Sequence, residues 1–255
     1  AWDFLTGELG LDPETLYVSI FETDDEAYAI WNTEVNVPAE RIYRLGAKDN
    51  FWQMGDVGPC GPCTEIYVDR GASYGHANVV DCGPGCDCDR FLEVWNLVFM
   101  QFDRQIDGSF KPLKQTGVDT GMGLERICSV VQDKETVYNT DLFAPILSKI
   151  EELTGVIYKN QQGENKAAFH VIADHIRSST MIIAEGCAPT NEGRGYVLRK
   201  IIRRAALFVQ KITDHNIFPE LSRVVIDEFG DIYPELKTNK DLIYTILKSE
   251  IEKFS

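Results

Sequence analysis

The sequence lacks any long apolar run, and it is poor in basic side chains and in histidine. It contains 25 Lys and Arg against 40 Asp and Glu, a formal net charge of −15, and 4 His among 255 residues. No stretch approaches the ~20 apolar residues that span a bilayer, and the beginning lacks the layout of a secretory signal. The excess of acidic side chains disfavours general affinity for nucleic acids, although a single basic region is compatible with it.

Cysteine is present in an odd number, 7, which excludes a disulfide framework that uses every thiol. Together with the missing signal, this predicts a cytoplasmic protein whose clustered cysteines are thiols or metal ligands. A hydrophobic content of 44% and a charged content of 25% are typical of a globular protein. The chain begins at Ala1 with Trp2 and Phe4 close behind, which predicts an internal fragment of a longer protein.

The apolar pattern divides the chain into a strand-rich part and a helical part. Alternation of apolar and polar residues, or enrichment in aromatic and branched residues, predicts strands at 15–23, 64–71 and 91–105. A helical period recurs at 24–35 and in five later segments, 141–155, 166–186, 193–212, 220–230 and 241–255. We therefore predict an α+β domain over residues 1–136, followed by an all-α domain over residues 137–255.

A glycine-rich turn before a short helix is predicted in "VDTGMGLERI", residues 118–127. Gly121 and Gly123 permit a tight turn and close approach of a ligand to the backbone. Arg126 follows in the first helical turn, where a cation costs roughly 0.3–1 kcal/mol against the helix dipole. Two explanations fit the residues alone: an anion such as phosphate binds there, or Arg126 pairs with a neighbouring carboxylate.

A basic segment interrupts the acidic sequence at 190–211. Arg199 and Arg203 are four residues apart, as are Lys200 and Arg204, so these cations share one face of the predicted helix. From the residues alone, this face is either solvated and paired with acidic groups or a surface for an RNA backbone. Asn191 precedes the helix and is either its N-cap or a recognition group, and Thr190 could equally serve as the cap.

Five of the cysteines lie close together in the sequence, with glycine and proline turns around them. Their spacing suits a tetrahedral zinc site, and free thiols are the alternative. These candidate ligands are Cys60, Cys63, Cys82, Cys86 and Cys88.

The string "GMGLERI" resembles motif 3 of the class II aminoacyl-tRNA synthetases, in which Gly-x-Gly-x-Glu-Arg lies between a strand and a helix. From Trp2 to the C-terminus, further blocks resemble the alanyl-tRNA synthetases in their usual order: "NFWQMGDVGPCGPCTEIYVDRG", "EVWNLVFMQFDRQ", "VDTGMGLERI", "VIADHIRSS" and "NEGRGYVLRKIIRRA". The resemblance implies part of a class II antiparallel sheet with flanking helices, followed by a helical tRNA-recognition domain. It also implies activation of alanine with ATP and Mg²⁺, and transfer of alanine to tRNA-Ala.

The resemblance implies an alanine pocket. Asp119 would hold the ammonium group of alanine, and Gly121 would leave room beside that carboxylate. Asn96 would form a hydrogen bond, Val98 would pack on the methyl group, and Trp52 would form a wall. Asn96 and Val98 are two residues apart on a predicted strand and therefore share a face. Ordinary core packing is the alternative for Val98 and Trp52.

The resemblance also implies an ATP site. Gly123 and Arg126 would bind ATP, with Arg126 on the phosphates, and Asp119 and Arg126 would be the catalytic residues. Motifs 1 and 2 of the family precede the region that this chain resembles. We therefore expect the isolated chain not to form alanyl-adenylate at a useful rate.

The helical part would bind the acceptor stem of tRNA-Ala. Asn191 matches an asparagine that helps to read the third base pair, G·U, in the shallow RNA minor groove. The full set of implied tRNA-binding residues is Asn191, Arg194, Arg199, Lys200, Arg203 and Arg204.

Because "GPCGPC" belongs to an active-site loop in the family, Cys60 and Cys63 would then be structural. A non-catalytic RNA-binding module is the alternative function.

Overall fold

The computed structural model describes residues 1–76 and 82–254, and the chain forms two compact units, Ala1–Val137 and Tyr138–Ser255. The division between these units lies one residue beyond the domain boundary that the sequence predicts, between residues 136 and 137. No helix in the described ranges combines the length and apolar character that a membrane span requires.

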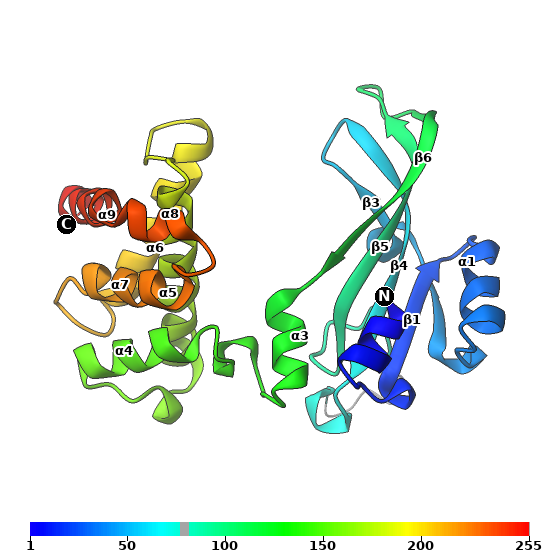
Figure 1. Ribbon diagram of the computed structural model, residues 1–255, viewed down its shortest axis with the longest axis horizontal. Coiled ribbons are helices and arrows are strands. Elements are labelled where there is room, and N and C mark those ends of the chain that lie inside the picture. The colour runs from blue at the N-terminus through cyan, green and yellow to red at the C-terminus, as the bar shows by residue number, and fades with distance from the viewer. Residues whose placement is uncertain (77–81, 255) are drawn as a thin grey trace. The chain divides into compact units, whose positions relative to one another are not determined.

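The first unit is built on one mixed sheet with strand order β2-β1-β4-β5-β6, and β3 pairs with β4 off this path (Figure 1). β1 and β2 are parallel, while the other pairs are antiparallel. The predicted α+β class is confirmed, with the difference that the sheet is not wholly antiparallel. The strands are β1 Leu16–Phe21, β2 Ile42–Leu45, β3 Phe51–Gln53, β4 Gly58–Asp69, β5 Phe91–Arg104 and β6 Phe110–Met122.

One face of this sheet carries the hydrophobic core. Val18 and Ile20 of β1 and Ile66 of β4 are buried on it, because alternate residues of a strand point to the same side. The α-helices of this unit are α1 Asp25–Ala29, α2 Ala47–Asn50 and α3 Leu124–Val131, and π-helical turns lie at Phe4–Glu8 and Ile30–Glu34. Trp31 of the second π-helical turn reaches the sheet, where its Nε1 donates to Thr64 Oγ1 at 2.8 Å. The opposite face is therefore left for the candidate site.

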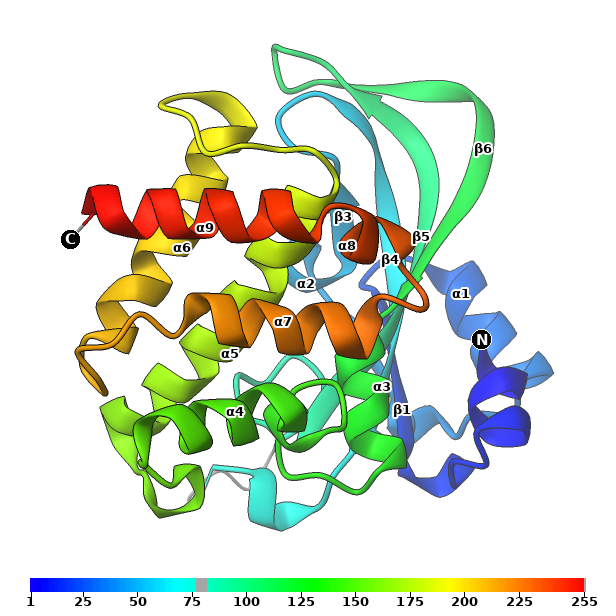
Figure 2. The same ribbon diagram turned by 60° about the vertical axis from the view of Figure 1, so that its left-hand side comes forward.

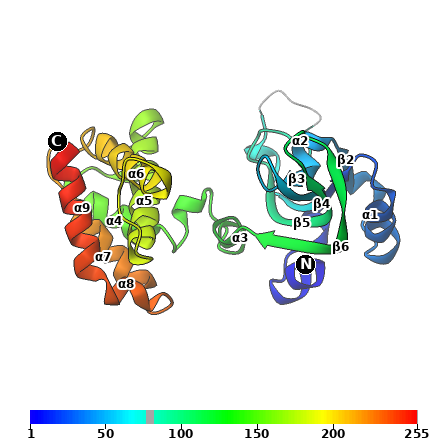
Figure 3. The same ribbon diagram turned by 90° about the horizontal axis from the view of Figure 1, so that it is seen from above.

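Two strands are longer than the sequence predicts. β4 begins at Gly58 and includes "GPCGPC", because that segment pairs with both β3 and β5. β6 continues through Gly121 to Met122, so Gly121 lies in a strand paired with Asn96 and not in the predicted tight turn. Gly123 is the N-cap of α3, and β6 leads directly into that helix (Figure 3).

Over its described residues, 138–254, the second unit consists of helices joined by turns, as predicted (Figure 2). Phe169, Ile172, Ile176 and Ile183 of the long helix α5 are fully buried, which confirms the apolar face predicted there. α5 contacts α4, α6, α7, α8 and α9 and forms the centre of the unit. The helices are α4 Ala144–Thr154, α5 Gly163–Ala184, α6 Gly193–Val209, α7 Phe218–Phe229, α8 Pro234–Thr238 and α9 Lys240–Phe254.

A histidine of α5 is held neutral inside this unit. The His170 ring stacks on Tyr138 with ring centroids 3.9 Å apart, and its Nε2 lies 2.7 Å from the Tyr158 hydroxyl oxygen. Burial, with a smaller contribution from Lys166, lowers the pKa of His170 from 6.5 to about 4.

This pKa predicts a pH-dependent contribution to stability. Between pH 6.5 and about 4, the unfolded chain binds a proton that the folded chain does not bind at His170. The free energy of unfolding therefore falls as the pH falls through this window. We expect His170→Gln to show a smaller loss between about pH 7 and about pH 5, measured by urea unfolding of both proteins. An equal loss in both proteins would contradict this account.

Candidate functional site

Cross-strand register brings polar and small residues together on the sheet face opposite the core. Glu65 of β4 lies beside Asn96 of β5, which lies beside Gly121 of β6. The neighbouring row, two residues along each strand, contains Cys63, Val98 and Asp119. Because side chains alternate along a strand, both rows face the same side.

These rows border a hollow of about 220 Å³. All five residues of the implied alanine pocket line it, together with Thr120: the set is Trp52, Asn96, Val98, Asp119, Thr120 and Gly121. Trp52 comes from β3, which pairs with β4 opposite Gly61. Trp52 keeps 37% of its surface exposed and is not a core residue, whereas Val98 is buried at 6%. The arrangement is a small cavity with one carboxylate and one amide at its border.

Glu65 is a site residue that the sequence reasoning missed. Its Oε1 accepts a hydrogen bond from Asn96 Nδ2 at 2.8 Å, and its Oε2 accepts one from the Tyr67 hydroxyl. Burial, reinforced by the charge of Glu93, raises the pKa of Glu65 to about 7 against the effect of the Tyr67 hydrogen bond. The available signal was alternation in the strand predicted at 64–71, in which Glu65 lies on the face opposite Thr64 and Ile66.

Arg126 pairs with a carboxylate in this structure. Its Nη1 donates to Glu93 Oε2 at 3.0 Å and to the Glu93 carbonyl oxygen at 2.9 Å. This is the second of the two explanations that the sequence left open. Both side chains are partly exposed, and an ion pair of this kind is worth only about 0–1 kcal/mol. The ion pair therefore orients Arg126 at the start of α3, and a ligand can break it at a small cost in free energy.

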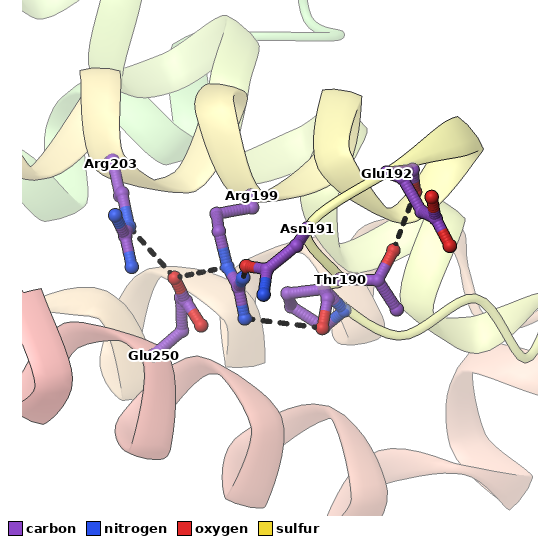
Figure 4. A network of polar contacts seen from close by, with 7 residues as sticks. Thr190, Asn191, Glu192, Arg199, Arg203 and Glu250 are labelled. Carbon is purple, nitrogen blue, oxygen red and sulfur yellow. Dashed lines mark hydrogen bonds and ion pairs between the residues drawn. The ribbon is translucent and has the colours of Figure 1, made fainter.

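The predicted row of cations on α6 divides into two groups. Arg199 and Arg203 converge on Glu250 of α9, with Nε–Oε1 distances of 3.0 and 2.9 Å (Figure 4). Lys200 and Arg204 are exposed, and so is Arg194 in the first turn.

Asn191 does not cap this helix. The N-cap residue of α6 is Glu192, whose side chain forms no capping hydrogen bond. The Asn191 Oδ1 instead accepts a hydrogen bond from Arg199 Nη1 (Figure 4). The N-cap explanation for Asn191 is therefore wrong. Thr190 is not the cap either, and its hydroxyl donates to the Glu192 carbonyl oxygen at 2.7 Å.

The structure brings together three of the five candidate zinc ligands. The sulfur atoms of Cys82, Cys86 and Cys88 all lie within 4.8 Å of one another. In the described part of the chain, Cys60 and Cys63 do not belong to this group, because both are buried in β4. Burial raises the pKa of the Cys60 thiol and raises that of Cys63 to about 12.

An ion pair closes the base of the segment that carries these three cysteines. Arg90 donates from Nε and Nη2 to the two carboxylate oxygens of Asp69, each at 2.7 Å. Asp69 ends β4, and its partner in the sheet register, Phe91, begins β5. The cysteine group therefore lies in the connection between two strands of the candidate site, outside their paired region.

The whole chain, residues 1–255, matches the tRNA synthetases class II (A), and it belongs to that family. Among individual proteins, it is 49% identical over 258 residues to the alanine–tRNA ligase of Desulfosudis oleivorans and 49% identical over 257 residues to that of Oleidesulfovibrio alaskensis. It is 48% identical over 255 residues to the alanine–tRNA ligase of Carboxydothermus hydrogenoformans. Each alignment covers 100% of this chain, which spans 29% of the length of each relative.

Two glycines near the hollow give a matched test of this geometry. A Cβ on Gly61 would lie 1.9 Å from the Phe99 carbonyl oxygen of β5, whereas a Cβ on Gly121 would meet nothing within 4 Å. We expect Gly61→Ala to lower the free energy of unfolding by about 2 kcal/mol or more, because the β4–β5 pairing must shift. Gly121→Ala should leave it nearly unchanged. Urea unfolding of both variants measures the difference, and equal effects would contradict the described register.

Proposed function

We propose that this chain is the part of an alanine–tRNA ligase that binds alanine and ATP and contacts the acceptor stem of tRNA-Ala. The observation that carries the proposal is the convergence of Trp52, Asn96, Val98, Asp119 and Gly121 on one small hollow. These residues come from three strands, and the resemblance had assigned each of them to an alanine pocket. The similarity to alanine–tRNA ligases over the whole chain supports the same conclusion.

The reaction joins the carboxylate of alanine to the α-phosphorus of ATP and releases pyrophosphate. An alanine carboxylate oxygen attacks in line, a new P–O bond forms, and the bond from the α-phosphorus to the departing pyrophosphate breaks. ATP enters as its Mg²⁺ complex, in which the metal neutralises phosphate charge. The protein groups chiefly position the reactants and balance their charge.

Asp119 and its neighbours select the amino acid. The Asp119 carboxylate offers a charge-assisted hydrogen bond to the ammonium group of alanine. Gly121, across β5–β6 from Asn96, leaves open space that a larger side chain would fill. A pocket of this kind rejects a side chain longer by one methylene by only about 1–3 kcal/mol, so it separates alanine from close analogues incompletely.

Arg126 serves the phosphates of ATP. Its weak, exposed pairing with Glu93 is exchanged for a phosphate, which the helix dipole at the N-terminus of α3 also favours. Gly123 allows this approach, since a Cβ there would lie 3.3 Å from the Arg126 side chain. Asp119 thus acts on the amino acid, and Arg126 acts on the phosphates of the nucleotide.

The helical unit binds the tRNA. Arg194, Lys200 and Arg204 are exposed and supply contacts to the RNA backbone, which give affinity without reading sequence. Asn191 is exposed beside them and reads the third base pair of the acceptor stem. A non-catalytic RNA-binding module is not favoured, because it would leave the lining of the hollow in the other unit without a role.

The alanine site is tested by ligand-induced stabilisation. At 100 times its dissociation constant, a non-hydrolysable alanyl-adenylate analogue should stabilise the chain by about 2.7 kcal/mol, seen as a thermal shift. We expect Asp119→Ala to abolish the shift, because the ammonium group loses its counter-charge. Asp227→Ala, an exposed change in the helical unit, should retain it. The absence of a shift in the unaltered chain, or an undiminished shift in Asp119→Ala, would contradict the proposal.

The cysteine group binds zinc through Cys82, Cys86 and Cys88. Three thiolates at Zn–S distances of about 2.3 Å lie roughly 4 Å apart in a tetrahedral site. The three sulfur atoms already lie within 4.8 Å of one another, so only small movements are required. Three protein thiolates leave the fourth position for water or another donor, and the bound ion would tie the β4–β5 connection together.

Metal analysis tests this site. Protein purified without added zinc should contain about one equivalent of zinc, and Cys86→Ser should lose most of it because two thiolates hold the ion poorly. Cys187→Ser, which changes a cysteine of the helical unit, is the control and should retain the metal. A metal-free unaltered protein, or full zinc in Cys86→Ser, would refute the assignment.

A further inference from the structure

The loop before α6 presents Asn191 in one fixed orientation, and this restricts what the residue can read. We infer that Arg199, anchored on Glu250, is a positioning residue that holds the Asn191 amide oxygen, so that Asn191 turns its amide nitrogen, a hydrogen-bond donor, toward RNA. This inference rests on the proposed tRNA-binding function and deepens it.

Glu250 of α9 is the anchor. It is 3% exposed, and its Oε1 accepts hydrogen bonds from the Nε atoms of both Arg199 and Arg203 (Figure 4). A carboxylate this deeply buried requires charge compensation, and the two guanidinium groups supply it. Because the guanidinium is planar and rigid, fixing the Nε atom of Arg199 also fixes the direction of its two terminal nitrogens.

Those terminal nitrogens reach the loop that precedes α6. Arg199 Nη1 donates to Asn191 Oδ1 (Figure 4). Its Nη2 donates to the Pro189 carbonyl oxygen at 3.4 Å. The loop is also held by close packing on Gly195, where a Cβ would lie 2.2 Å from Thr190 Oγ1 and 2.3 Å from the Ala188 carbonyl oxygen. The backbone and the side chain of Asn191 are thus both constrained.

The chemistry of the two groups sets the orientation of the amide. A guanidinium only donates hydrogen bonds, so the Asn191 nitrogen cannot take the place of its oxygen beside Arg199. The Nδ2 group has no hydrogen-bond partner among the described residues, and Asn191 is exposed. In an RNA minor groove it therefore binds acceptors: pyrimidine O2, purine N3 or a ribose 2′-hydroxyl.

A double-mutant cycle separates positioning from a general effect of charge. Arg199→Met and Arg203→Met each remove one positive charge from the Glu250 cluster and keep an apolar stem, but only Arg199 contacts Asn191. The affinity of the full-length natural protein for an acceptor-stem RNA duplex is measured for each variant, alone and combined with Asn191→Ala.

Asn191→Ala should weaken binding roughly 3- to 10-fold, the worth of one hydrogen bond. Arg199→Met should weaken it in the Asn191 protein, and most of this effect should vanish in Asn191→Ala, whereas Arg203→Met should have the same effect in both backgrounds. 2-Thiouridine, whose sulfur is a weak acceptor, or a 3-deazapurine, which lacks N3, should reduce the effect of Asn191→Ala when it replaces the contacted base.

Arg204→Gln distinguishes the failure of this inference from failure of the proposed function. Arg204 is an exposed cation outside the Glu250 cluster, so its loss should weaken binding and reduce the salt dependence. If Arg204→Gln weakens binding but Arg199→Met is equally harmful with and without Asn191, the positioning role is refuted alone. If neither Arg204→Gln nor Asn191→Ala changes RNA affinity, both the positioning role and the tRNA-binding function are refuted.

Discussion

The hydrogen-bond register of β4, β5 and β6 is the constraint on which the candidate site depends. It sets Glu65 beside Asn96 and Gly121, and it places Asp119 one row away on the same face. A shift of one residue in any of these strands would turn its contribution toward the hydrophobic core. The buried carboxylate of Glu65 reinforces the register, because it holds Asn96 across the β4–β5 pair. Pocket and sheet are therefore specified by the same contacts.

Local patterns in the sequence were sufficient for most elements. Alternation predicted β1, enrichment in aromatic and branched residues predicted β5, and helical period predicted the apolar face of α5. These signals all come from residues close together in the chain. The extension of β4 through "GPCGPC" was not predicted, since proline and glycine are rare in strands and only its pairing with β3 and β5 keeps it extended. The strand position of Gly121 was missed for the same reason.

Contacts between residues far apart in the sequence could not be predicted either. The spacing of Arg199 and Arg203 correctly placed them on one helix face, but nothing nearby in the sequence reveals that Glu250, on another helix, neutralises both. The pairing of Arg126 with Glu93 joins α3 to β5, and the whole of β6 lies between these two elements in the sequence. Charge patterns thus locate cations on a surface, while tertiary contacts decide which of them remain available to a ligand.

The Asp69–Arg90 ion pair affects how well the connection between β4 and β5 tolerates a change in its length. It closes the β4–β5 connection at its base, next to the register pair of Asp69 and Phe91. The cost of closing a loop grows only slowly with its length, so residues beyond the closure can be inserted or deleted at little energetic expense. The length of this connection can therefore change while the strands around the pocket keep their alignment.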